Sequence, residues 1–176
     1  MDIVNVDTGV DYRRRTLEQV RLYLTPITEQ TQDELKEVFY ALTGESPAAS
    51  SIEIENRQLP VIACHSNVVW FDFKTLCEGP RSQNDYLDLV SRFETVILSD
   101  VPKMAARDAS AARRFTWLID VLYDHKVKFI MSAAVEAAEL YTAGPMSGEF
   151  HRTESRLMEM QSKEYVDYER RQAAVL

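Results

Sequence analysis

Two consecutive helix-to-strand units in the second half of the chain most strongly constrain the fold. In the first unit, Ser82 and Asp85 form a capping box before a predicted helix of about eleven residues, and the apolar run TVILS (95–99) follows before Pro102. The second unit is AARRFTWLIDVLYDHKVKFIMSA (111–133), in which a helical stripe precedes the strand VKFIMSA. The stripe consists of Phe115, Leu118, Ile119 and Leu122. Because both strands are mostly apolar, we predict that segments 96–99 and 127–132 are adjacent, parallel and covered by helices.

The first half of the chain predicts shorter elements. Ile3, Val4 and Val6 predict an opening strand, and RLYLTP (21–26) predicts another. Thr31 with Glu34 forms a capping-box pattern for a helix of about 31–43, which Gly44 ends. The alternating segment 51–73 predicts an antiparallel meander.

These elements predict one α/β unit over 1–176, in which a partly parallel sheet with covering helices joins the antiparallel meander. We divide it into strands and a helix (1–50), the meander (51–78) and an α/β segment (79–176). Thr153 and Glu154 are expected to cap a final helix that continues through Leu157, Met160 and Tyr165.

Composition narrows the classes of function. The 176-residue chain has 45% hydrophobic residues, enough for a core, and a formal net charge of −8. An acidic chain lacks the cationic surface on which nucleic-acid affinity depends, so we expect no nucleic-acid partner and favour a protein partner. Two cysteines without metal or redox spacing fit a reduced cytoplasm, and no apolar run approaches the length of a transmembrane helix.

Motifs of nucleotide and metal chemistry are sparse. The phosphate-binding pattern G-x-x-x-x-G-K-[ST] does not occur. TVILSDVP (95–102) resembles the strand that carries magnesium in P-loop enzymes, but Val and Pro follow Asp100, which favours a strand-ending aspartate. The three histidines have no metal-site spacing, so we expect no metal site.

The arginine pair at 113 and 114 is the remaining candidate. At 100° per residue, Arg114 lies on the flank of the apolar stripe, whereas Arg113 points nearly opposite, beside Trp117 and Asp120. A guanidinium on the flank can reach an anion at the edge of the domain. Spacing alone favours an ordinary salt bridge between Arg114 and a carboxylate, and a solvated Arg113.

Several segments together resemble the C-terminal half of the ZapE family of AAA+ ATPases, in order and spacing, over nearly the whole chain. The segments are VNVDTGVDYRRRTL, WFDFKTLCEGPRSQNDYL, VILSDVP, ARRFTWLIDVLYDHKVKFIMSA and FHRTESRLMEMQSKEY. In that family a P-loop, a magnesium-binding acidic strand and a sensor strand precede the segment D-I-V-N-V-D. The resemblance therefore implies the C-terminal part of a P-loop NTPase, and we expect this chain alone to bind no ATP with useful affinity.

The resemblance also implies a function for the complete protein. That protein would use ATP and Mg²⁺, act in bacterial cell division with the ring protein FtsZ, and form homo-oligomers through its ATPase half. It would work in the cytoplasm, at the division site near the inner membrane. Arg113 and Arg114 would be candidates for an arginine that senses the nucleotide's phosphates. The alternative is a stand-alone protein-interaction module without nucleotide chemistry.

Overall fold

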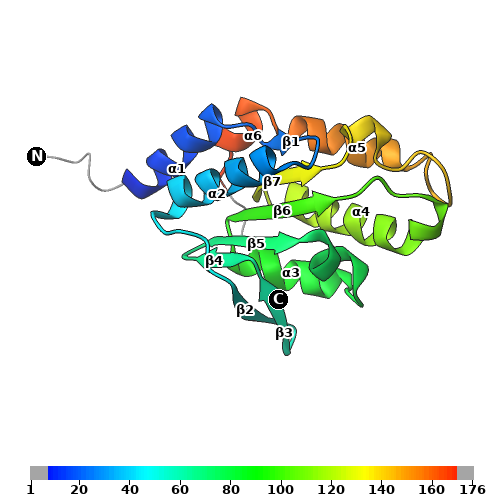
Figure 1. The fold of residues 1–176 in the computed structure, drawn as a ribbon, viewed down its shortest axis with the longest axis horizontal. Coiled ribbons are helices and arrows are strands. Elements are labelled where there is room, and N and C mark those ends of the chain that lie inside the picture. The colour runs from blue at the N-terminus through cyan, green and yellow to red at the C-terminus, as the bar shows by residue number, and fades with distance from the viewer. Residues whose placement is uncertain (1–7, 170–176) are drawn as a thin grey trace, which may run out of the picture.

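A computed structural model describes residues 8–169 (Figure 1). The helices are α1 (Thr8–Gln19), α2 (Glu29–Thr43), α3 (Gln83–Arg92), α4 (Ala109–Asp124), α5 (Phe150–Glu159) and α6 (Lys163–Asp167). The strands are β1 (Tyr23–Leu24), β2 (Ser50–Ile54), β3 (Arg57–Val61), β4 (Ala63–His65), β5 (Val68–Asp72), β6 (Thr95–Val101) and β7 (Lys128–Ala133). Short helical turns occupy Lys74–Glu78 (η2), Ala106–Asp108 (η3) and Ala137–Glu139 (η4).

The main sheet has five strands in the order β1-β7-β6-β5-β4. Strands β1, β7, β6 and β5 pair in parallel, and β4 joins antiparallel to β5 at the edge. Val96 lies opposite Phe129 and Leu98 opposite Met131, which confirms the predicted parallel pairing of 96–99 with 127–132. The mixed α/β class is therefore confirmed.

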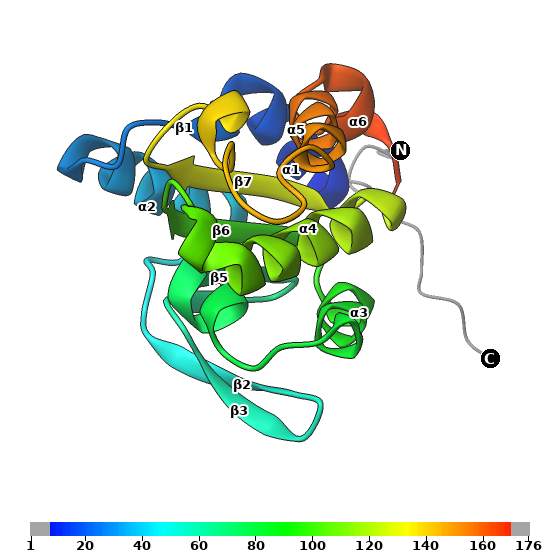
Figure 2. The ribbon, with the colours of Figure 1, turned by 90° about the vertical axis from the view of Figure 1, so that its right-hand side faces the viewer.

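Helices cover both faces of the sheet, because alternate residues along a strand point to opposite sides (Figure 2). On one face Trp70, Ile97 and Ile130 belong to a core with Leu35 and Phe39 of α2. On the other face, side chains of β5, β6 and β7 pack against α3, α4 and α5; they include Val69, Phe71, Val96, Leu98, Phe129 and Met131. The near-continuous apolar sequence of the central strands follows from this double burial.

Helix ends agree with the sequence signals in part. The Ser82/Asp85 capping box starts α3 as predicted, and the Ser82 backbone N–H donates to Asp85 Oδ2 at 2.7 Å. Gly44 ends α2 with a left-handed φ of 76°, also as predicted. The start of α2 was predicted wrongly, because the cap is Thr28 and Thr31 is the N3 residue of its box.

The predicted meander over 51–73 is wrong in one respect. Its strands pair antiparallel, but they form two hairpins in two sheets: β2 with β3 alone, and β4 with β5 in the main sheet. The β2–β3 hairpin extends beyond the main sheet in Figure 2. Leu59 and Val61 of β3 are buried against the main core, so tertiary packing holds the hairpin there.

The two ends of the chain also differ from expectation. The predicted final helix is two helices, and Thr153 is a buried residue inside α5, where its hydroxyl donates to Thr116 Oγ1 at 3.4 Å. Ser162, not Thr153, caps the second helix by accepting a hydrogen bond from the Tyr165 backbone N–H. Helix α1 was not predicted, and the strand expected at residues 3–6 lies outside the described residues.

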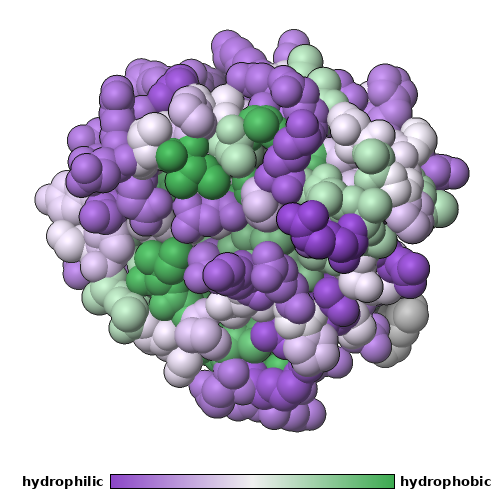
Figure 3. Space-filling model, turned by 45° about the vertical axis from the view of Figure 1, so that its right-hand side comes forward, coloured by the Kyte–Doolittle hydropathy of each residue, from purple (hydrophilic) through white to green (hydrophobic). Residues whose placement is uncertain are grey.

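Hydrophilic residues predominate on the face shown in Figure 3, where apolar residues form small separate patches. Between residues 8 and 169, no helix is long and apolar enough to cross a membrane.

Candidate functional site

The carboxyl ends of β5, β6 and β7 lie together at one edge of the parallel sheet, which is where α/β folds place their ligand crevices. Asp72 ends β5 and accepts a hydrogen bond from the Thr75 backbone N–H at 2.8 Å. Asp100, near the end of β6, has a positive φ of 65°, and its backbone N–H donates to Ser132 Oγ of β7 at 2.9 Å. This edge is therefore built by polar contacts between neighbouring strand ends.

Asp100 is the strand-end aspartate that the sequence singled out. Partial burial raises its pKa, and the neighbouring carboxylate of Asp72 raises it further. In the described residues 8–169, no group of three or more His, Cys, Asp or Glu side chains is arranged to hold a metal ion.

Arg114 lies on the side of α4 that faces η2. Its apolar neighbour Phe115 is fully buried, whereas Arg114 itself is half-buried. The Arg114 guanidinium donates from Nη1 to the Cys77 carbonyl oxygen at 3.2 Å. Within the described part of the chain it forms no ion pair with a carboxylate, so the salt bridge favoured by spacing alone is not found there.

A second arginine, Arg81, lies beside Arg114 in the turn between η2 and α3. Its Nε donates to the Thr75 carbonyl oxygen at 3.0 Å, and its Nη1 donates to the Pro80 carbonyl oxygen at 3.2 Å. Burial lowers the pKa of Arg81, and the positive charges of Arg57 and Arg114 lower it further, whereas the negative charge of Asp85 opposes this shift. The positive charges are therefore close enough to repel one another.

Arg57 has its own carboxylate partner and so differs from the other two arginines. Its guanidinium forms an ion pair with Asp85, a residue that is only 2% exposed. The same Asp85 carboxylate accepts the Ser82 backbone N–H at the start of α3. Asp85 is thus already committed to Arg57 and to the helix cap.

The floor under Arg81 and Arg114 is uncharged. Cys77 and Tyr86 are fully buried, and the Tyr86 hydroxyl donates to the Leu76 carbonyl oxygen at 2.8 Å. Burial raises the pKa of both the Cys77 thiol and the Tyr86 phenol, so both remain neutral at physiological pH. A low-dielectric floor of this kind strengthens any electrostatic interaction that the two guanidinium groups make.

Arg113 faces a different neighbourhood, as its helical position predicted. It is exposed and lines a groove of about 1010 Å³ between α4, α5 and the loop that follows Tyr141. Trp117 and Asp120 line the same groove, and Asp120 is paired with Arg152 and Arg156 of α5. The structure therefore directs the two arginines of the pair to different surfaces of α4.

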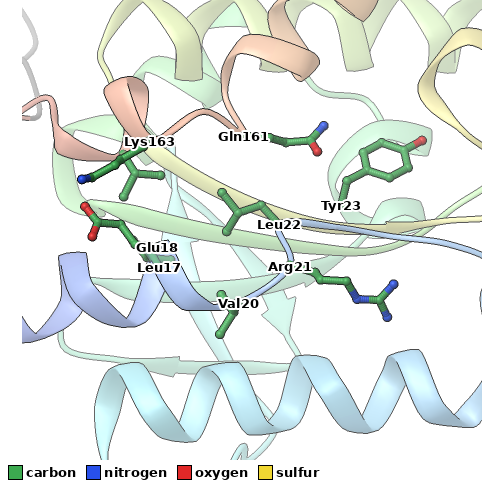
Figure 4. Close-up of a pocket in the computed structure, with 9 residues that line it drawn as sticks. Leu17, Glu18, Val20, Arg21, Leu22, Tyr23, Gln161 and Lys163 are labelled. Atoms are coloured by element: carbon green, nitrogen blue, oxygen red, sulfur yellow. The ribbon is translucent and has the colours of Figure 1, made fainter.

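A second cavity, of about 340 Å³, lies where the end of α1 meets β1 and the α5–α6 junction (Figure 4). Glu18 and Lys163 lie at one end of it, and Arg21, Tyr23 and Gln161 lie at the other. The Tyr23 hydroxyl proton is already used, because it donates to the Val135 carbonyl oxygen at 2.7 Å.

Sequence reasoning missed Arg81. The available signal was the turn Gly79-Pro80-Arg81 directly before the Ser82 cap, which places an arginine at a helix start close to the carboxyl end of β5. Sequence alone did not show that Arg114, 33 positions later, lies beside it.

Comparison with known proteins places the chain in a family. The model of the AFG1-like ATPase family matches residues 1–169. Cell division protein ZapE of Escherichia coli K12 is 42% identical over 96% of this chain and 45% of its own length. An uncharacterized protein of Schizosaccharomyces pombe is 34% identical over 82% of this chain and 33% of its own length.

A more distant relative is lactation elevated protein 1 homolog B of Danio rerio, which is 29% identical over 93% of this chain and 40% of its own length. No solved structure matches. This chain spans less than half the length of the curated relatives it matches. With a family model matched over nearly its entire length, the chain belongs to the AFG1-like ATPase family.

Proposed function

We propose that this chain is the C-terminal part of an ATPase that hydrolyses ATP with Mg²⁺ and acts in bacterial cell division, and that Arg114 senses the phosphates of the bound nucleotide. The observation that carries the role of Arg114 is its position near the carboxyl edge of the parallel sheet without a carboxylate partner among residues 8–169. Family membership supports nucleotide use, and the cell division relative supports the process.

Geometry explains how Arg114 would act. The backbone carbonyl of Cys77 holds one N–H of the guanidinium, which leaves the others available to a phosphate. An arginine that contacts the transferring phosphoryl group stabilises charge that develops in the transition state. Replacing it should therefore lower kcat more than it weakens binding of ATP.

The test uses a full-length relative, in which the residue aligned with Arg114 is replaced by Ala. We expect kcat for ATP hydrolysis to fall by at least about tenfold, with a smaller change in KM. The matched control is the residue aligned with Arg113, whose replacement should change kcat much less. Equal and small effects at both positions would overturn the role of Arg114.

The partner is a separate part of the proposal. We propose that the complete protein binds FtsZ in the cytoplasm, at the division site near the inner membrane; the support is the cell division relative. Co-sedimentation of the full-length relative with FtsZ polymers tests this. A relative that does not co-sediment with the polymers, either with ATP or without it, would contradict the proposal.

A further inference from the structure

Arg81 and Arg114 share one surface although they come from different elements. Arg114 belongs to α4, Arg81 to the turn before α3, and both lie over the buried pair Cys77 and Tyr86. Arg81 Nε donates to the Thr75 carbonyl oxygen at 3.0 Å and Arg114 Nη1 to the Cys77 carbonyl oxygen at 3.2 Å, so both guanidinium groups are held by carbonyls two residues apart in η2.

Most of their hydrogen-bonding capacity is unused. A guanidinium carries five N–H donors in a fixed plane. Arg81 uses Nε and Nη1, and Arg114 uses Nη1 alone, each on a backbone carbonyl. Among residues 8–169, Nη2 of both arginines and Nε of Arg114 have no acceptor.

The surroundings supply too little negative charge for these two cations. Asp85 is buried and committed to Arg57 and to the α3 cap. Glu78 is close enough to raise the pKa of Cys77, but within the described residues it forms no ion pair with Arg81 or Arg114. Arg57, Arg81 and Arg114 thus share the buried carboxylate of Asp85, and a bound anion would offset the remaining positive charge.

We propose that Arg81 and Arg114 together form one binding site for a phosphate-type oxyanion. Two planar guanidinium groups can each donate a pair of parallel N–H bonds to the oxygens of a phosphate, a geometry that lysine does not provide. The identification of the anion as a nucleotide phosphate rests on the proposed function. The site itself rests on the contacts of the two arginines.

Binding is tested on this chain by titrating it with inorganic pyrophosphate at low ionic strength and following the side-chain Nε–H signals of its arginines by NMR. We expect saturable shifts of the Arg81 and Arg114 signals at millimolar pyrophosphate. Arg81→Ala and Arg114→Ala should each weaken binding at least about fivefold, whereas Arg113→Ala should leave it unchanged. Equal shifts at all exposed arginines, or no saturation, would overturn the site.

A second pair of variants covers the case in which an alanine variant fails to fold. Arg81→Lys and Arg114→Lys retain the charge but lose the bidentate geometry, so each should still weaken pyrophosphate binding. Circular dichroism checks that each variant is folded. Binding as tight as that of the unaltered chain in both lysine variants would overturn the two-arginine geometry.

A third measurement separates this site from the proposed function. In the full-length relative, the residues aligned with Arg81 and Arg114 are each replaced by Ala and ATP turnover is measured. Loss of pyrophosphate binding in this chain with unchanged ATP turnover in the relative would support the anion site and overturn its nucleotide role. Reduced turnover on replacing the residue aligned with Arg114, with pyrophosphate binding unchanged in this chain, would do the reverse.

Discussion

Cations at the two ends of the parallel sheet make different contacts. At the carboxyl edge, Arg81 and Arg114 contact only backbone carbonyls and keep unused donors. At the amino end of β7, Lys128 donates to the Tyr165 carbonyl oxygen at 2.9 Å and the Tyr168 carbonyl oxygen at 2.5 Å, and its ammonium also lies 5.0 Å from the centre of the Tyr165 ring.

Lys126 belongs to the same amino-end cluster. Its ammonium lies 4.4 Å from the centre of the Tyr123 ring and 4.9 Å from that of Tyr168, distances at which cation–π attraction operates. Tyr165 completes the cluster, because its buried hydroxyl donates to the carbonyl oxygens of Leu122 and Val127. Here the cations are used to attach α6 to the body of the fold.

A cation that stabilises the fold differs from one that is available to a ligand. A structural cation such as Lys128 contacts carbonyl acceptors and aromatic rings of its own chain, and removing it should lower stability. A ligand-binding cation has donors left over, and removing it should lower binding with little loss of stability. Four predictions test this distinction: three sets of substitutions, from the largest expected effect on stability to the smallest, and then a pH dependence.

Tyr165→Phe should lower the free energy of unfolding by about 2 kcal/mol, because the Val127 carbonyl oxygen loses its hydroxyl donor in a buried place, whereas the Leu122 carbonyl oxygen still accepts from the Val127 backbone N–H. The measurement is urea denaturation followed by circular dichroism. Tyr168→Phe is the matched control, since Tyr168 is exposed and its ring remains over Lys126, and its effect should be near zero. Equal effects of the two variants would contradict a structural role for the Tyr165 hydroxyl.

Lys128→Met should lower the free energy of unfolding by about 1 kcal/mol, because charge-assisted bonds to two carbonyls are lost while the aliphatic packing is retained. The loss is smaller than the bond strengths suggest, since the variant also escapes the cost of burying an ammonium group. The same denaturation experiment measures it. No loss of stability would show that α6 stays attached without Lys128.

Arg81→Ala and Arg114→Ala should each change the free energy of unfolding by only about 0.5 kcal/mol, because each loses hydrogen bonds to carbonyls but also relieves repulsion between the two cations. Thermal or urea denaturation at low salt checks this. A loss of about 2 kcal/mol or more in either variant would place that arginine with the structural cations of the amino end.

The last prediction is a pH dependence at Lys128. Burial, and then the charge of Lys126, lower the pKa of Lys128 from its usual 10.5 to about 8. Between these two values the unfolded chain binds more protons than the folded chain, so the contribution of Lys128 to stability increases as pH rises from 8 to 10.5. The free energy of unfolding of the unaltered chain should therefore rise relative to that of Lys128→Met across this window. A relative fall would contradict the lowered pKa.

Local sequence signals predicted the central elements well. Each correct signal depends only on residues that are close together in the sequence. These signals are the capping box at Ser82 and Asp85, the apolar stripe from Phe115 to Leu122 and the apolar run of β7. Sequence signals did not predict the boundaries of elements that depend on partners far away in the sequence. Strand β1 has two residues, and its boundaries follow from pairing with Met131 and Ser132.

The errors share a physical cause. The segment predicted as one meander alternates correctly, yet the division between its two hairpins depends on whether β3 packs on the core or pairs with β4. Likewise, Thr153 has the residue type of a cap, but α5 begins before it and buries its hydroxyl against Thr116. Residue type and spacing do not contain these contacts.

The sequence by itself determined the α/β class, the parallel pairing of β6 with β7 and the opposite orientations of Arg113 and Arg114, because helical and strand periodicity fix which side chains share a face. Only the tertiary structure decided that Arg114 lies beside Arg81 and that Asp85 forms an ion pair with Arg57. Those relations join residues about 30 positions apart, and they arise from the packing of α4 against α3 and η2 over a common buried floor.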